Sequence, residues 1–137
     1  MTYEELRRLA RQTNWEKSRT LFQVLKKVLE IMDEEDYVNG YVKHLFNDEN
    51  DMLDIYIVTS KEKLIVAKYL HPDKTIQLKI LDIAAIDEID LLENTDGTME
   101  LSIAFNSGYT IHFNSRENYD HEHKNHIPDF LRSLYNS

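Results

Sequence analysis

The residue types best suited to chemistry lie together in one short stretch near the end of the sequence. Three histidines and two carboxylates fall within residues 120–126. A neutral imidazole ligates zinc, nickel or copper, and two histidines in a His-x-His pair on an extended chain could share such an ion. The simpler interpretation is a solvated loop before a helix, because no second anchor such as a His-Glu-x-x-His helix occurs. We therefore predict no metal centre, and the only candidate ligands are His121, His123 and His126.

Paired carboxylates are the next candidates, since two of them can act together as general acid and general base. Asp87 with Asp90, and Asp82 with Glu88, have suitable types. Such pairs are expected at any spacing in a chain with 25 acidic residues. No Gly-x-Ser-x-Gly elbow, phosphate-binding glycine loop or dinucleotide motif occurs, and three glycines could hardly build one. We predict no enzyme activity, no catalytic residue and no cofactor.

Composition indicates one soluble domain in a reducing compartment. The chain has 137 residues, of which 42% are hydrophobic and 30% charged, as in ordinary globular proteins. It contains no cysteine, which excludes disulfides and thiolate metal sites. The first residues are acidic, unlike a signal peptide, and no apolar run approaches the ~20 residues that cross a bilayer. We predict a cytoplasmic protein without a transmembrane segment, and the abundance of Lys, Asn and Ile suggests an AT-rich bacterial genome.

The charge distribution argues against a nucleic-acid partner. The net charge is -9, and residues 37–115 carry 13 acidic but only six basic groups. A surface of this sign repels phosphate backbones, whose neutralisation by Lys and Arg dominates nucleic-acid affinity. We therefore predict that the protein does not bind nucleic acid.

Two capping boxes predict two helices at the start of the chain. Residues 2–5 and 13–16 both have the form Thr-x-x-Glu, in which a hydroxyl and a carboxylate each satisfy a free amide at a helix start. The second helix should extend to about Met32, because the four acidic residues that follow are unfavourable at a helix C-terminus. Its apolar residues cover about half of the helix circumference, so it needs two packing partners.

This wide apolar arc has two interpretations. One flank could pack on a sheet and the other on the first helix. Alternatively, part of the arc is exposed as a dimer or partner contact, since an apolar surface of several hundred Å² usually marks an interface. The candidate contact residues are Trp15, Leu21, Val24, Val28 and Ile31.

From Tyr37 onward the pattern changes to short alternating runs that predict seven antiparallel strands. The alternation requires a sheet with one wet face, as where Leu53, Ile55 and Ile57 share one side. Gly40 interrupts the first run and suggests a bulge there. Isoleucine recurs every three positions within residues 83–92, which could therefore form a helix, but we interpret them as a strand. Asp96-Gly97 marks a hairpin.

A terminal helix should begin with Pro128 at its first position and cover the sheet. Its apolar residues are Ile127, Phe130, Leu131, Leu134 and Tyr135. We expect Tyr109 and Tyr135 in the core. The sequence thus predicts an α+β protein, with a helical appendage over residues 1–36 and a strand domain with its terminal helix over residues 37–137.

Two segments of the strand region resemble bacterial pleckstrin-homology-like domains. They are Lys61-Glu62-Lys63-Leu64-Ile65-Val66-Ala67 and Leu81-Asp82-Ile83-Ala84-Ala85-Ile86. The resemblance covers residues 37–136 and implies a bent sandwich or open barrel, closed at one end by the terminal helix. Eukaryotic members bind inositol phosphates through a basic cluster in the first strands and their loop. Here that loop, residues 47–51, is acidic, so phosphoinositide binding is not expected.

Two functional hypotheses follow chiefly from the missing chemistry. The first is a non-enzymatic interaction module that binds a protein or peptide and could also form a homodimer. The alternative is an acidic immunity or antitoxin-type protein, whose negative sheet surface would meet a basic partner through electrostatic steering.

Overall fold

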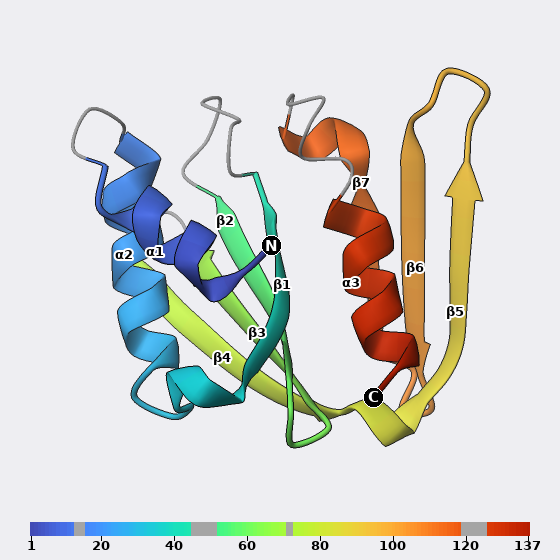
Figure 1. Cartoon of the computed structure of the whole chain (residues 1–137), viewed down its shortest axis with the longest axis horizontal. Helices are drawn as coiled ribbons and strands as arrows, with labels where there is room; N and C mark the ends of the chain where they lie inside the picture. The colour runs from blue at the N-terminus through green and yellow to red at the C-terminus, as the bar shows by residue number, and fades with distance from the viewer. Residues whose placement is uncertain (13–15, 45–51, 71–72, 119–125) are drawn as a thin grey trace.

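The computed structural model describes residues 1–12, 16–44, 52–70, 73–118 and 126–137. In these residues the chain forms three α-helices and seven antiparallel strands, arranged in a four-stranded sheet A and a three-stranded sheet B. The two N-terminal helices lie on one side of sheet A, and sheet B and the C-terminal helix lie on the other (Figure 1). The sheets do not close into a barrel. The predicted α+β class is therefore confirmed.

Sheet A has the order β1-β2-β3-β4. Its strands are β1 (Tyr37–Lys43), β2 (Leu53–Thr59), β3 (Lys63–Leu70) and β4 (Thr75–Asp82). The alternating runs predicted these strands correctly. The prediction that one face of the sheet is solvated was wrong for β2, because every residue of this strand is buried. Leu53, Ile55 and Ile57 face the helices, while Tyr56 and Val58 face sheet B.

The bulge in β1 does not lie at the glycine. The pairing register with β2 shifts between Tyr37 and Asn39, whereas Gly40 pairs regularly with Ile57. Glycine is required there for space, since a Cβ would collide with the Tyr37 hydroxyl and lie 3.3 Å from the Tyr56 carbonyl oxygen. The predicted bulge at Gly40 was therefore wrong, and close packing explains the residue.

The N-terminal helices are α1 (Tyr3–Ala10) and α2 (Glu16–Val28). Thr2 caps α1 as predicted, and its hydroxyl accepts a hydrogen bond of 3.2 Å from the Glu5 amide. The second capping box lies largely in residues 13–15, outside the described residues. α2 ends earlier than the predicted Met32, since the amides of Ile31 and Met32 both bond to the Val28 carbonyl and tighten the chain into a turn. A short 3₁₀ segment (Glu34–Asp36) then leads into β1.

Sheet B begins after a 3₁₀ turn, Ile83–Ala85, that carries the chain from β4 to the second sheet. Its strands are β5 (Ile86–Glu93), β6 (Met99–Phe105) and β7 (Thr110–Asn114). Residues 83–92 are thus partly turn and partly strand. The predicted Asp96-Gly97 hairpin joins β5 to β6, with Gly97 at φ 87°, a value that favours glycine. After β7, a 3₁₀ segment spans Ser115–Asn118.

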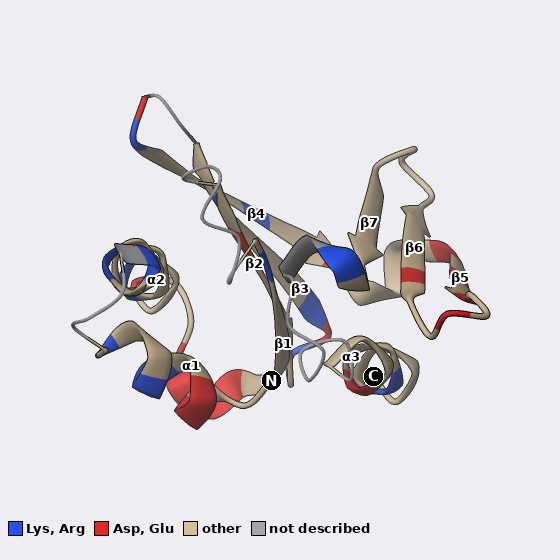
Figure 2. Ribbon diagram, turned by 90° about the horizontal axis from the view of Figure 1, so that it is seen from above, with Lys and Arg blue, Asp and Glu red and all other residues tan. Residues whose placement is uncertain are grey.

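Helix α3 (His126–Tyr135) lies between the two sheets and packs on β1 (Figure 2). Ile127, Phe130 and Leu134 are buried, as predicted. Pro128 is the third helical residue rather than the first. Tyr135 is 84% exposed, so its predicted core position was wrong.

The two faces of sheet A support two separate hydrophobic clusters. The cluster under α1 and α2 is mainly aliphatic, whereas the cluster between the sheets is centred on aromatic rings. Phe113 is the hub of the second, with its ring centroid 4.6 Å from Tyr41, 4.7 Å from Tyr56 and 5.3 Å from Phe130. The helices thus share a core with sheet A, and the boundary between residues 36 and 37 stays a prediction.

Candidate functional site

An apolar groove lies between the two N-terminal helices, and we call it the helix-pair groove. It encloses about 360 Å³. Its lining residues are Tyr3, Arg7, Ala10 and Arg11 on or just after α1, Phe22, Leu25, Lys26 and Leu29 on or just after α2, and Glu34. Apolar side chains form most of the lining, and charged groups stand around them. A groove of this kind can bind an apolar side chain and fix the charges beside it.

The groove exists because the apolar arc of α2 is wider than the surface that sheet A and α1 cover. Leu21, Val24 and Val28 are completely buried beneath the helix. The next positions around the helix lie beyond the reach of the sheet, and α1 covers them only in part. Phe22 therefore stays 52% exposed and Leu29 37% exposed. The sequence predicted a two-sided helix, and the structure leaves one flank partly open.

Basic groups border the groove on both helices. Arg7 lies on α1, Arg11 directly follows that helix and Lys26 lies on α2, and Figure 2 shows basic residues on each helix. Glu34 also lines the groove and interacts with Tyr3. Burial, followed by the hydrogen bond to the Glu34 carboxylate, raises the pKa of the Tyr3 hydroxyl above its ordinary value. The site therefore pairs an apolar centre with a mainly positive border.

The predicted contact residues are only partly accessible. Trp15 lies outside the described residues. Leu21, Val24 and Val28 are core residues, so no partner can reach them in this structure. Ile31 is 48% exposed but does not line the groove. The exposed apolar residues that do line it are Phe22 and Leu29, which belong to the same apolar arc but were not selected, because helical periodicity alone does not show which flank the sheet covers.

The outer face of sheet B carries two of the predicted carboxylate candidates. Glu88 and Asp90 line a shallow hollow of about 380 Å³ together with Ser102 and His112. The His112 Nδ1 lies 3.0 Å from the Ser102 hydroxyl, and its Nε2 lies 3.9 Å from a Glu100 carboxylate oxygen. These three groups form cross-strand contacts on an exposed face, with the His112 side chain 55% exposed.

The two carboxylate pairs do not form catalytic dyads in this arrangement. Asp82 instead forms an ion pair with Lys63. Asp87 lies at the bulge of β5, where the register shifts between Ile86 and Glu88, and it does not line the hollow that contains Asp90. The hollow that contains Glu88 and Asp90 therefore includes neither of their predicted partners, Asp82 and Asp87.

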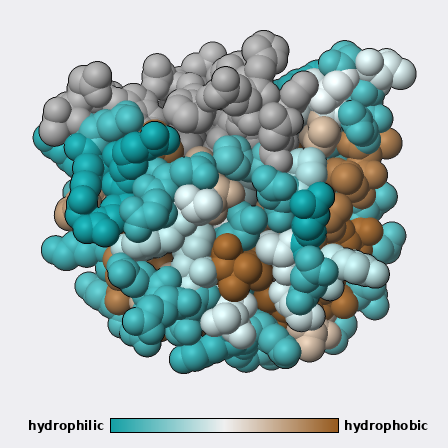
Figure 3. Space-filling view, viewed as in Figure 1, coloured by the Kyte–Doolittle hydropathy of each residue, from teal (hydrophilic) through white to brown (hydrophobic). Residues whose placement is uncertain are grey.

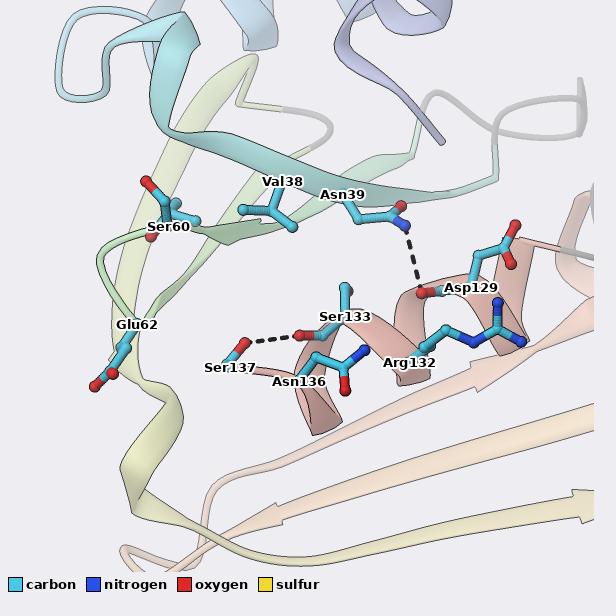
Figure 4. A pocket seen from close by; sticks show the side chains of 10 residues that line it. Val38, Asn39, Ser60, Glu62, Asp129, Arg132, Ser133, Asn136 and Ser137 are labelled. Carbon is cyan, nitrogen blue, oxygen red and sulfur yellow. Dashed lines mark hydrogen bonds between the residues drawn. The ribbon is translucent and has the colours of Figure 1, made fainter.

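A second, polar groove runs between β1 and α3 (Figure 4). It encloses about 520 Å³. Several of its polar groups form hydrogen bonds with other groups of the protein. The Asn39 side-chain amide donates to the Asp129 carbonyl at 3.3 Å, and the Ser137 hydroxyl donates to the Ser133 carbonyl at 2.7 Å. The Asn39 bond joins the helix to the edge strand and the Ser137 bond caps the helix end, so we interpret the groove as a structural seam.

A buried lysine joins α2 to the strands. Lys17 is only 5% exposed, and its ammonium group donates hydrogen bonds of 2.7 Å to the carbonyls of both His44 and Met52. Nearby, burial raises the pKa of the Asp54 carboxyl, although Lys68 and Lys43 oppose the shift. Burial likewise lowers the pKa of His44, whose Nδ1 has no hydrogen-bond partner within the described residues.

The histidine cluster lies mostly beyond what the structure describes. His121 and His123 are outside the described residues, and His126 is the first residue of α3. The described residues contain no group of three or more His, Cys, Asp or Glu side chains that could hold a metal ion. None of the helices in the described part of the chain is long and apolar enough to cross a membrane.

These features define a mixed α+β protein with an apolar groove between its two N-terminal helices. A family model described as "Protein of unknown function (DUF3908)" matches residues 3–130. The chain therefore belongs to this family. The match begins in α1 and ends within α3, so it includes the helix pair as well as both sheets. No curated protein and no solved structure matches the chain.

Proposed function

We propose that this protein is a cytoplasmic, non-enzymatic interaction module, and that the helix-pair groove docks a short acidic and apolar segment of a protein partner. The observation that carries the proposal is the exposure of Phe22 and Leu29 within a groove bordered by Arg7, Arg11 and Lys26. A sequence without cysteine supports a reducing compartment.

The chemistry of the groove defines the partner. Large apolar side chains left open in a concave site favour a leucine-like anchor, since desolvated pockets supply most of the energy of an interface. Positive groups around the pocket favour carboxylates beside that anchor, because complementary charges fix the register of a bound segment. A basic segment would place like charges against Arg7 and Lys26.

We also propose that residues 37–136 form a pleckstrin-homology-like domain behind the helix pair. Seven antiparallel strands followed by a C-terminal helix support this proposal, since a strand sandwich closed by a terminal helix is what the sequence resemblance implies. The fold would then serve as a scaffold, and the helix pair would carry the binding site. A shared fold does not define a ligand, so the groove itself must carry the functional argument.

A labelled peptide tests the docking function directly. The probe is a fluorescein-labelled helical peptide with leucines at positions i, i+3 and i+7 and glutamates on its other faces. Its fluorescence anisotropy should rise on titration with the protein. A matched peptide with lysine in place of glutamate should bind about tenfold more weakly, which corresponds to ~1.4 kcal/mol.

Neighbouring residues on α2 supply the matched variants. Lys26→Glu reverses a charge in the groove, whereas Lys27→Glu reverses one outside it, where Lys27 pairs with Glu30 at 3.0 Å. Lys26→Glu and Phe22→Ser should each weaken binding of the acidic peptide, and Lys27→Glu should leave it unchanged. Equal binding of both peptides, or equal effects of the two lysine variants, would show that the groove is not the docking site.

The acidic neutralising protein is a second candidate because the outer face of sheet B is acidic. Glu88 and Asp90 border an open hollow there, so a basic partner would find complementary charge. This function predicts that a strongly basic nuclease co-purifies with the protein from its source cells. The variant Glu88→Lys combined with Asp90→Lys should abolish that association. Retention of the nuclease by the double variant would contradict a role for this face.

A further inference from the structure

We propose that the helix-pair groove accepts residues 90–93 of a second copy of this chain, so that copies associate head to tail. This segment, which we call the acidic leucine segment, is Asp90-Leu91-Leu92-Glu93 at the end of β5. The inference rests on the proposed docking function of the groove and names its partner.

The acidic leucine segment carries exposed leucine side chains of the kind that the groove would bind. Leu91 is 40% exposed and Leu92 is 53% exposed. They point to opposite faces of sheet B, since Leu91 pairs with buried Leu101 and Leu92 with Glu100. β5 is an edge strand with a neighbour on one side only within the described residues, so both leucines project from a margin of the molecule. Figure 3 shows apolar surface gathered over β5 and β6 at this margin.

The charges of the two surfaces are complementary. Asp90 and Glu93 flank the two leucines, are exposed, and form no ion pair within the described residues. The groove offers Arg7, Arg11 and Lys26 around an apolar centre. Asp90 and Leu92 share one face of β5, so docking would place the Asp90 carboxylate against these basic groups and Leu92 against Phe22 and Leu29. The contact thus combines removal of apolar surface from water with attraction between unlike charges.

One chain cannot satisfy both surfaces by itself. The helix pair and β5 lie at opposite sides of the molecule (Figure 1). The contact is therefore between different patches of two copies, and each added copy exposes a new groove and a new acidic leucine segment. Such a contact is small, so association should be weak and depend strongly on protein concentration.

Sedimentation equilibrium over a wide concentration range tests the inference. The average mass of the wild-type protein should rise with concentration. Lys26→Glu in the groove and Leu92→Ser in the acidic leucine segment should each weaken association by about tenfold. The matched controls are Lys27→Glu, and Ile80→Ser on β4, where an equally exposed apolar side chain lies outside both surfaces. Both controls should associate like the wild type, and circular dichroism should show all variants folded.

Mixing the two variants provides the sharper test. Lys26→Glu keeps an intact acidic leucine segment, and Leu92→Ser keeps an intact groove. Their equimolar mixture should therefore form dimers that cannot grow further, although each variant alone stays mainly monomeric. A mixture that stays monomeric like its components would overturn the head-to-tail arrangement.

The outcomes separate this inference from the docking function on which it rests. If the wild type stays monomeric at every concentration while the acidic peptide still binds in a Lys26-dependent way, the second copy is not the partner and the docking function stands. If the acidic peptide also fails to bind, both are wrong. Equal loss of association in Lys26→Glu and Lys27→Glu would likewise exclude the groove as the contact.

Discussion

The two faces of sheet A are buried by different means. On one face, α1 and α2 cover aliphatic residues such as Ile55 and Ile57. On the other face, sheet B and α3 enclose an aromatic cluster around Phe113. The helix-covered face leaves an open groove at its margin, whereas the side chains between the sheets are almost completely buried. The comparison teaches that the aromatic side should contribute more stability per residue and that the helix side retains surface for binding.

The largest expected effect is the loss of the aromatic hub. Phe113→Ala removes a fully buried ring that contacts Tyr41, Tyr56 and Phe130, and should lower the free energy of unfolding by about 4 kcal/mol. Val24→Ala, also fully buried but under the helices, should cost about 2 kcal/mol. Urea unfolding measures both values. Equal losses would show that the two faces do not differ in this way.

The next effect concerns the lysine that links the helix face to the strands. Lys17→Met keeps the length of the side chain but leaves the carbonyls of His44 and Met52 without their donor. We expect a loss of about 2 kcal/mol, because a hydrogen bond from a charged donor contributes ~1.5–3 kcal/mol. Lys27→Met is the matched control on the exposed side of the same helix and should change stability by less than about 0.5 kcal/mol. Similar stabilities of the two variants would argue against the link.

Much of the strand order was predictable because alternation and turn residues are local signals. All seven predicted strands are present, and Gly97 of the predicted Asp96-Gly97 hairpin has a positive φ that few residue types favour. The burial of β2 was not predictable in the same way. Asp54 suggests a wet face, yet the second sheet covers that face from a distant part of the chain.

The candidate site was predictable only as a helix with too much apolar surface. Whether Leu21 or Phe22 becomes the exposed residue depends on how α2 rotates over sheet A, and α1 must also be placed. Residues 83–92 were ambiguous for the same reason. Their isoleucines recur every three positions because a 3₁₀ turn is followed by a bulged strand. In each case the local structure or exposure depends on tertiary packing, which cannot be read from a short stretch of sequence.

A smaller effect, of opposite sign, is expected where sheet A buries a carboxyl. Since burial raises the pKa of Asp54, the folded state binds its proton more tightly than the unfolded state. This contribution therefore destabilises the fold as pH rises from below the ordinary value of 3.8 through the raised pKa. Asp54→Asn should gain stability relative to the wild type as pH rises through this window, and the gain should stay constant above it.

The matched control for this pH dependence is Asp96. Hydrogen bonds from Thr98, and then from Arg116, lower its pKa to about 2. Its contribution is therefore present above the ordinary value of 3.8 and is lost as pH falls toward 2, so Asp96→Asn should lose stability at neutral pH relative to acid pH. Urea unfolding of both variants between pH 3 and pH 7 measures the difference. The same sign in both variants would contradict the assignment of the Asp54 shift to burial.

The smallest expected effect is that of Tyr135→Ala on the exposed flank of α3, and Leu134→Ala on the buried flank is its reference. Leu134 is buried between the sheets, and Leu134→Ala should cost about 3 kcal/mol. Tyr135 follows it directly but is 84% exposed, so Tyr135→Ala should change the free energy of unfolding by less than about 0.5 kcal/mol. Urea unfolding again provides the measurement. A loss above 1 kcal/mol in Tyr135→Ala would mean that the ring packs against the protein in solution, and the aromatic cluster would then extend beyond the inner face of α3.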